Sequence, residues 1–139
     1  MDFTLNDEEQ AIHDLTEQIL ADHSTNDRLK QIAAADDHVD RDAWAALAAG
    51  GVVGAAIPEA HGGLGLGYLA TATAVQVAAS HGSPVPLLST SVMGAMPIGE
   101  YGTDAQQASW LPAIADGSLL SATALFETGT SPAKPLTTA

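Results

Sequence analysis

The hydrophobic residues of this chain recur at helical spacing from its start. Between residues 6 and 23, one face of the predicted helix carries Ile12, Leu15, Ile19 and Leu20. Asn6, followed three residues later by Glu9, matches a capping box, in which two side chains satisfy free backbone N–H groups at a helix start. The pattern therefore predicts a first helix over residues 6–23, and weaker periodicity predicts a shorter one over residues 28–35.

A third helix is predicted to begin after Asp40, because aspartate is a favoured N-cap residue. Its apolar stripe consists of Trp44, Leu47 and Ala48. The glycine pair at 50–51 is expected to end it, since glycine adopts the backbone conformation that closes many helices.

Two further apolar stretches carry almost no charge. Residues 68–80 are rich in alanine and threonine, and we place on one face Leu69, Ala72, Val75, Gln76 and Ala79. With so little charge on any side, this helix is expected to be buried nearly all round. A second apolar segment covers residues 87–101.

Thr103 with Gln106 forms another capping-box pattern, which predicts the start of a further helix. Pro112 is expected to kink or interrupt this helix.

The last part of the chain changes character. Residues 119–126 have the pattern of a strand, and residues 129–135 that of a turn-rich loop. The sequence therefore predicts an all-α fold, a bundle of five or six helices, ending in the first strand of a sheet. Because a lone strand has unpaired backbone groups, we expect the chain to be a fragment that ends at Ala139, or a partner to supply the missing strands.

The composition of the chain excludes several kinds of partner and chemistry. The chain has 139 residues with a formal net charge of −13, and its four basic residues are scattered, so neither nucleic acid nor an anionic membrane is expected as a partner. It contains no cysteine, which excludes disulfides and thiolate chemistry. The acidic start lacks a signal-peptide pattern and no apolar run is long enough to span a membrane, so a cytoplasmic location is expected.

Few residues suggest chemistry on their own. Gly65-Leu66-Gly67-Tyr68-Leu69-Ala70 fits a loose dinucleotide-binding fingerprint, but its surroundings favour a plain interhelical glycine turn. The five histidines are isolated, so no metal site is expected. Met93 and Met96 favour helix packing, although the small neighbours Gly94 and Gly99 leave room for an apolar ligand beside them.

The order of the motifs along the chain resembles the N-terminal helical domain of the flavin-dependent acyl-CoA dehydrogenases. The resemblance covers essentially the whole chain. It rests on the opening MDFTLNDEEQ, Trp44-x-x-Leu47-Ala48, Gly51-x-x-Gly54, Ile57-Pro58-Glu59, His61-Gly62-Gly63-Leu64-Gly65, Met96-Pro97-Ile98, Gly102-Thr103-Asp104-x-x-Gln107 and Trp110-Leu111-Pro112-x-Ile114-Ala115-x-Gly117.

This resemblance implies an N-terminal helical domain over 1–117 and the start of a truncated middle β-domain over 118–139. It also implies that the complete enzyme oxidises acyl-CoA to 2,3-enoyl-CoA, with FAD as hydride acceptor. The catalytic glutamate of the family lies in a C-terminal domain that this sequence does not contain. No catalytic residue is therefore assigned, and the fragment itself is expected to be inactive.

The resemblance places the acyl chain between helices of both helical domains. The expected substrate-lining residues are Leu88, Val92, Ala95, Met96 and Gly99. The expected flavin contacts are backbone groups of Leu125 and Phe126. This sequence differs from the family's flavin motif at two positions, where Phe126 replaces a threonine and Pro132 replaces a serine.

These departures leave two interpretations open. In one, the chain is part of an ordinary dehydrogenase subunit, assembled as a homo- or hetero-tetramer. In the other, which the lost hydrogen-bond donors slightly favour, it is a structural subunit with a degenerate FAD site in a heteromeric dehydrogenase. A third and more distant interpretation is an isolated helical binding module.

Overall fold

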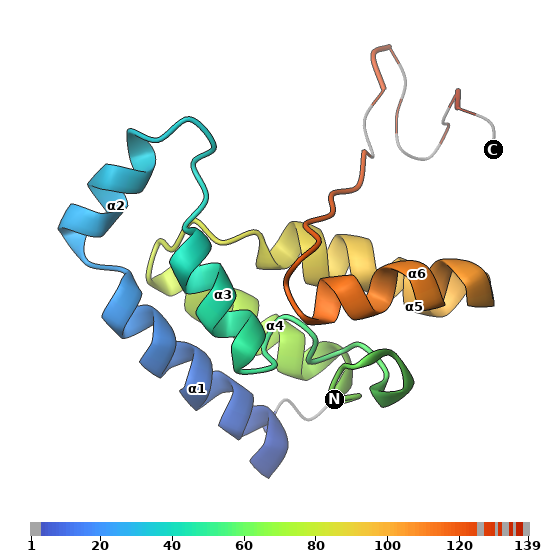
Figure 1. Ribbon diagram of the computed structural model, residues 1–139, viewed down its shortest axis with the longest axis horizontal. Helices are drawn as coiled ribbons and strands as arrows, with labels where there is room; N and C mark the ends of the chain where they lie inside the picture. The colour runs from blue at the N-terminus through green and yellow to red at the C-terminus, as the bar shows by residue number, and fades with distance from the viewer. Residues whose placement is uncertain (1–3, 125–126, 130, 132–133, 135, 138–139) are drawn as a thin grey trace.

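The computed structural model describes residues 4–124, 127–129, 131, 134 and 136–137. Within them the chain forms six α-helices, a short 3-10 helix, η1, and a π-helix, η2, without any β-strand (Figure 1). The predicted all-α fold class with five or six helices is confirmed. In chain order the elements are α1 (Asp7–His23), α2 (Asn26–Ala33), α3 (Arg41–Ala49), η1 (Glu59–His61), α4 (Gly67–Ser80), η2 (Leu88–Ala95), α5 (Met96–Tyr101) and α6 (Asp104–Ala115).

The helix starts follow the local capping signals. Asn6 Oδ1 accepts a hydrogen bond from the Glu9 N–H at 2.9 Å, and Glu9 Oε2 accepts one from the Asn6 N–H at 2.9 Å. Thr103 and Gln106 form the same reciprocal pair at the start of α6. Both predicted capping boxes are confirmed, since each depends only on residues three positions apart.

Apart from α2, which lies at the edge of the molecule in Figure 1, the α-helices and η2 pack around one apolar core. The first helix, α1, packs against α3 and α4, while α6 packs against η1, η2 and α5. The largest fully buried apolar side chains are Leu20, Leu47, Val52, Val53, Leu87, Leu111 and Ile114. One hydrogen bond joins distant parts of the chain: the Trp44 indole N–H donates to the carbonyl of Gly117 at 2.8 Å.

Two expectations for the helices need correction. The helix α4 is not buried nearly all round: Tyr68 is 61% exposed, and Gln76 and Ala79 are exposed as well. Its buried face consists of Ala70, Thr71, Thr73, Ala74, Val77 and Ala78, because α1 and η2 do not enclose its full circumference. Pro112 does not interrupt α6, which continues to Ala115. A proline removes one backbone N–H donor, and the rest of the helix ladder continues past it.

The strand predicted over 119–126 is not found in its described part, residues 119–124, which has no regular secondary structure. Its backbone bonds to helices instead: the Leu119 N–H donates to the carbonyl of Ala113 at 2.8 Å, and Ser121 bonds to Thr90. A strand needs a neighbouring strand to complete its hydrogen-bond ladder, and the described residues provide none.

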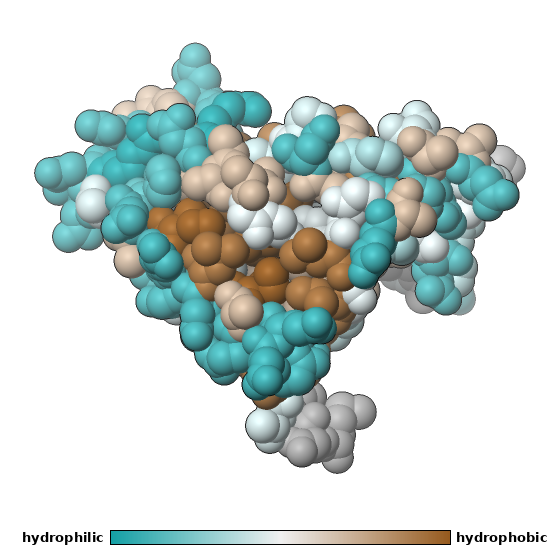
Figure 2. Space-filling view, turned by 60° about the horizontal axis from the view of Figure 1, so that its bottom comes forward, coloured by the Kyte–Doolittle hydropathy of each residue, from teal (hydrophilic) through white to brown (hydrophobic). Residues whose placement is uncertain are grey.

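Charge and apolar surface are unevenly distributed over the molecule. Twelve of the seventeen acidic residues lie within the first 42 positions. On the face turned forward in Figure 2, hydrophobic residues gather near the centre and hydrophilic residues frame them. In the described part of the chain, every helix is too short or too polar to cross a membrane.

Candidate functional site

The π-helix η2 forms one wall of the candidate site. Two buried hydroxyl groups anchor it: Ser91 Oγ donates to the carbonyl of Val53 at 2.9 Å, and Thr90 Oγ1 donates to the carbonyl of Ser121 at 3.0 Å. The Ser121 N–H donates back to Thr90 Oγ1 at 3.3 Å. The first contact joins residues 38 positions apart and the second residues 31 apart, so tertiary contacts hold η2 in place. Helices of this rare type occur frequently at functional sites.

An open hollow of about 550 Å³ lies between η2, α5, α6 and residues 119–124, and we call it the η2–α6 hollow. Its lining residues are Met93, Gly94, Pro97, Ile98, Trp110, Ile114, Leu119, Ser121, Ala122, Thr123 and Ala124. The volume lies within the range of about 300–1,000 Å³ that is usual for small-molecule sites. None of these side chains is an acid or a base. The hollow can therefore hold an apolar chain, but the described residues around it provide no proton-transfer group.

Most residues of the η2–α6 hollow were missed as candidates from the sequence. For Met93 the sequence predicts helix packing with room for an apolar ligand beside it, and Trp110 enters only as part of a helix and of the family motif. The available signal was two pairs at a spacing of four, Met93 with Pro97 and Trp110 with Ile114, because residues four apart share one helix face. That spacing does not reveal that the face with Met93 and Pro97 meets the face with Trp110 and Ile114.

The five sequence-predicted lining residues do not form a single site. Leu88 is 54% exposed and borders a hollow beside α4. Val92 and Met96 line another, of about 330 Å³. Met96 also joins Ala95 and Gly99 around a third, of about 160 Å³. These side chains lie on faces of η2 and α5 other than the one lining the η2–α6 hollow, and whether they contact a substrate stays a prediction.

The predicted flavin contacts, Leu125 and Phe126, lie outside the described residues. The neighbouring Glu127 carboxylate accepts hydrogen bonds from the Thr137 hydroxyl, from the Leu136 N–H at 2.6 Å and from the Thr137 N–H at 2.9 Å. The bond from the Thr137 hydroxyl and the two backbone N–H groups hold the pKa of Glu127 below its usual value. Its oxygens are thus engaged within the chain, and a carboxylate has no donor to offer a flavin phosphate.

The glycine-rich segment before α4 is an interhelical turn, in agreement with the favoured interpretation. Its N–H groups bond within the protein: Leu64 to the carbonyl of Gly54 at 3.1 Å, Gly65 to that of Ile57 at 2.9 Å, and Leu66 to that of Ala55 at 2.8 Å. Residues 52–66 contain no strand. These N–H groups are therefore not free to bind a pyrophosphate, and the structure gives no support to a dinucleotide site.

The main charged cluster lies away from the η2–α6 hollow and links α2 to the start of α3. Arg28 Nε donates to Asp40 Oδ2 at 2.9 Å, and Arg28 Nη2 donates to Asp40 Oδ1 at 2.7 Å. The same Nη2 contacts the exposed Asp42 at 2.7 Å. Arg28 holds the pKa of Asp40 below its usual range, although burial opposes the shift. The Asp40 carboxylate also caps α3 by accepting from the Ala43 N–H at 3.2 Å, which points to a structural role.

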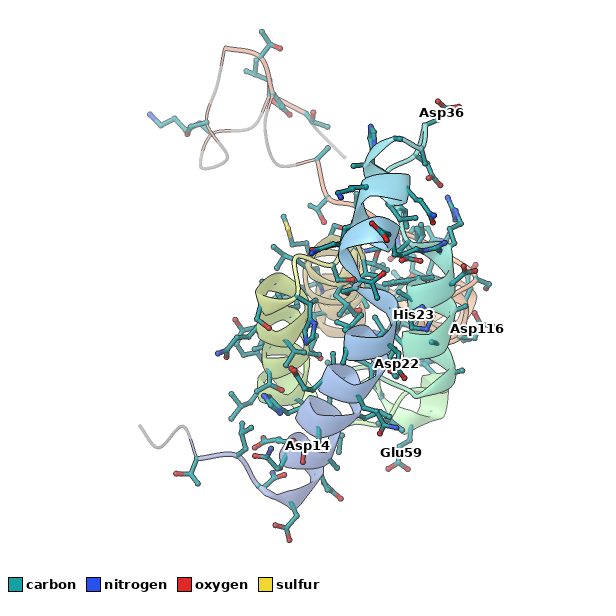
Figure 3. The ribbon with its side chains drawn as sticks, turned by 90° about the vertical axis from the view of Figure 1, so that its left-hand side faces the viewer. Asp14, Asp22, His23, Asp36, Glu59 and Asp116 are labelled. Carbon is teal, nitrogen blue, oxygen red and sulfur yellow. The ribbon has the colours of Figure 1, made fainter. Side chains whose placement is uncertain are left out.

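Other ionisable side chains are dispersed over the surface. Figure 3 shows Asp14 and Asp22 on α1, Asp36 after α2, and Glu59 and Asp116 on separate segments. His13 pairs with Asp14, and His81 Nε2 lies 2.9 Å from Glu17. Among the residues that the structure describes, no three histidine, aspartate or glutamate side chains are placed to hold a metal ion.

Known proteins share both this sequence pattern and this fold. Residues 6–118 match the model of the acyl-CoA dehydrogenase N-terminal domain. Acyl-CoA dehydrogenase FadE28 of Mycobacterium tuberculosis is 32% identical over 139 residues, which cover 99% of this chain and 35% of that protein.

Two solved structures extend the similarity to three dimensions. A variant of the Tcur3481-Tcur3483 steroid ACAD has a TM-score of 0.89 and 38% identity, over 95% of this chain and 36% of that one. The ChsE4-ChsE5 complex from Mycobacterium tuberculosis has a TM-score of 0.86 and 26% identity, over 94% of this chain and 36% of that one. The chain thus spans about a third of the length of these relatives. With a family match over most of its length, the chain belongs to the acyl-CoA dehydrogenase family and corresponds to its N-terminal helical domain.

Proposed function

We propose that the chain is the N-terminal part of a dehydrogenase subunit which, when complete, converts an acyl-CoA into a 2,3-enoyl-CoA. FAD would serve as the hydride acceptor. One observation carries the proposal: the chain belongs to this family and has an apolar hollow of about 550 Å³ against a π-helix, with no titratable side chain among the described residues that line it. The chain alone is expected to be inactive, because the hollow supplies no base.

The chain's own contribution in this proposal is to bind and shield the acyl chain. Met93 and Pro97 on one side, with Trp110 and Ile114 on the other, offer apolar surface that favours a hydrocarbon over water. Shielding the reacting carbons from water strengthens every electrostatic interaction at the reaction centre. The apolar wall would therefore contribute both to the preference for a certain acyl-chain length and to the rate of dehydrogenation.

A pair of substitutions tests which side of the helix binds the acyl chain. Met93→Trp fills the η2–α6 hollow, whereas Met96→Trp fills the smaller hollows bordered by the sequence-predicted residues. We expect Met93→Trp to shift the complete enzyme toward shorter acyl-CoA substrates and Met96→Trp to leave the preference unchanged. The reverse result would place the acyl chain along the wall that includes Val92 and Gly99. No change in either variant would contradict an acyl site at this helix.

The end of this sequence does not fit the family's flavin motif. At the two positions where that motif has hydroxyl donors, this sequence has Phe126 and Pro132. Among the described residues nearby, the Glu127 carboxylate is already hydrogen-bonded within the chain. Proline has no backbone N–H to replace the missing hydroxyl. In this proposal FAD is held by residues outside the described part of the chain.

This misfit favours a second candidate function, a structural subunit with a degenerate FAD site in a heteromeric dehydrogenase. One similar structure is itself a complex of two different proteins, ChsE4 and ChsE5. The test is the flavin spectrum of the protein carrying this chain, purified with and without any co-encoded partner. Stoichiometric flavin in the lone protein supports the ordinary subunit, whereas flavin found only with the partner supports the degenerate one. Tetramer assembly and a cytoplasmic location stay predictions.

A further inference from the structure

The hydroxyl group of Thr90 bonds away from its own helix. Serine and threonine hydroxyls inside helices commonly donate back to a carbonyl about one turn earlier. In this structure five hydroxyls do so, those of Thr16, Thr71, Thr73, Ser80 and Ser89. Thr90 instead bonds to residue 121, which lies 31 positions further along the chain and outside any helix. Its hydroxyl therefore holds a different segment of the chain.

That segment, residues 119–124, forms one side of the η2–α6 hollow, and we call it the strap. It provides five of the eleven lining residues, namely Leu119, Ser121, Ala122, Thr123 and Ala124. In the middle of the strap, the Ser121 N–H donates to Thr90 Oγ1 at 3.3 Å, and the Ser121 carbonyl accepts from the same oxygen at 3.0 Å. One hydroxyl thus bonds to both backbone groups of Ser121, as a paired residue of a neighbouring strand would.

Thr90 supports the wall of the hollow from behind. It is fully buried, and it is not one of the described residues that line the hollow. The other bonds of the strap lie toward its ends, where the Leu119 N–H donates to α6 and the Thr123 hydroxyl donates to η2. Between them the strap lies directly on η2, since a Cβ atom at Gly94 would be 2.0 Å from Ser121 Oγ. The position of the strap's centre across η2 therefore depends on the Thr90 hydroxyl.

From this arrangement we propose that Thr90 is a positioning residue, which acts through the backbone of Ser121 to set the width of the η2–α6 hollow. The proposal rests on the proposed function and deepens it, because the width of the hollow determines how closely its walls contact the acyl chain. Without the hydroxyl, both backbone groups of Ser121 lose their partner, and the strap has to move to find others. Because the strap provides nearly half of the lining, its movement exposes part of the bound hydrocarbon to water.

Binding of two CoA thioethers tests the proposal in the complete protein that carries this chain. S-octyl-CoA and S-butyl-CoA differ only in the length of the hydrocarbon, and neither can be dehydrogenated, because both lack the thioester carbonyl. Calorimetry gives the ratio of their dissociation constants, which does not depend on how much of the protein is folded. We expect Thr90→Val to reduce the preference for S-octyl-CoA about tenfold, the effect of exposing about two methylene groups to water.

Ser91→Ala is the matched control. It removes the other buried hydroxyl of η2 that bonds to a distant segment, the carbonyl of Val53 at 2.9 Å, and Val53 is not one of the described lining residues. Its loss lowers stability without moving the strap, so the ratio is expected to stay at the wild-type value. Thr90→Ser keeps the hydroxyl and is also expected to keep the ratio. A purely structural role of Thr90 would lower Tm in Thr90→Val and leave the ratio unchanged.

Thr90→Cys replaces Thr90→Val as the test if the latter does not fold. A thiol is similar in size to the threonine side chain but forms weaker hydrogen bonds, so a smaller change in the same direction is expected. An unchanged ratio in the variant that folds would overturn the role of Thr90. An equal change in Ser91→Ala or in Thr90→Ser would overturn it too, as would a wild-type protein that binds neither thioether.

The outcomes separate this proposal from the proposed function. The dehydrogenase proposal is decided by enoyl-CoA formation in the complete enzyme. Activity with an altered ratio in Thr90→Val supports both proposals, and activity with an unaltered ratio supports the dehydrogenase alone. An altered ratio in a protein without this activity would support the positioning role for a CoA ligand and contradict the dehydrogenase.

Discussion

The ion pair between Arg28 and Asp40 allows a sharp test of how burial sets the strength of a charged contact. Arg28 forms a hydrogen bond of 2.7 Å with each of two aspartates, Asp40 and Asp42, through the same nitrogen. Asp40 is 1% exposed, whereas the side chain of Asp42 is 73% exposed. The two acids share a cation and a distance, but Asp40 is shielded from water and also accepts a second bond, from Arg28 Nε at 2.9 Å.

Asp40→Asn is the informative substitution, since asparagine keeps the shape and the N-cap of α3 while removing the charge. Losing one partner of a fully buried pair costs roughly 3–5 kcal/mol. Here Arg28 stays partly exposed and keeps Asp42, which reduces the penalty. We expect the free energy of unfolding to fall by about 2 kcal/mol. For Asp42→Asn we expect at most about 0.5 kcal/mol, because solvent screens an exposed pair.

Urea unfolding followed by circular dichroism measures both variants against the wild type. Equal losses in the two would refute the reasoning, since it assigns the larger loss to the acid that is buried and bonded twice to Arg28. The pH dependence gives a second check. The pKa of Asp40 lies below the unfolded value of about 3.9, so its contribution is complete above that pH and disappears as pH falls through the folded pKa. The gap between the wild type and Asp40→Asn should therefore close on acidification, and a constant gap would contradict the assignment.

Four further substitutions probe the packing, and one of them, Gly99→Ala, is a control. Leu47→Ala, at a fully buried position, is expected to lower the free energy of unfolding by about 3 kcal/mol, measured in urea. Gly63→Ala would bring a methyl group 2.0 Å from the carbonyl oxygen of Ile57, so a marked drop in Tm is expected, while Gly99→Ala, with open space around it, should not lower Tm. Trp44→Phe removes the indole hydrogen bond and should cost about 1 kcal/mol beyond the lost apolar contact; an unchanged urea midpoint would contradict this.

Features encoded by neighbouring residues could be predicted from the sequence. The capping boxes at Asn6 and Thr103 and the N-cap at Asp40 each depend on groups within three positions, and all three were predicted correctly. The face of α4 was assigned wrongly for the opposite reason. With alanine and threonine around its whole circumference, the sequence does not mark which side meets α1.

The candidate site was harder to predict because distant segments assemble it. Nothing local distinguishes η2 from an ordinary helix, since the hydroxyls of Thr90 and Ser91 bond to residues 31 and 38 positions away. The segment that closes the η2–α6 hollow was predicted as a strand from its apolar pattern. Its backbone bonds to α6 and η2 instead, and these long-range contacts cannot be predicted from the sequence.

The bond from the Trp44 indole to the Gly117 carbonyl also constrains when the domain can fold during synthesis. Its two residues lie 73 positions apart, on α3 and just beyond α6. Contacts between α1, α3 and α4 can form while the ribosome is still adding residues, because all three precede position 81. The closing contact cannot form until residue 117 has left the ribosomal tunnel. A pause in translation before that point would leave the apolar side chains that pack on α6 uncovered and available to chaperones.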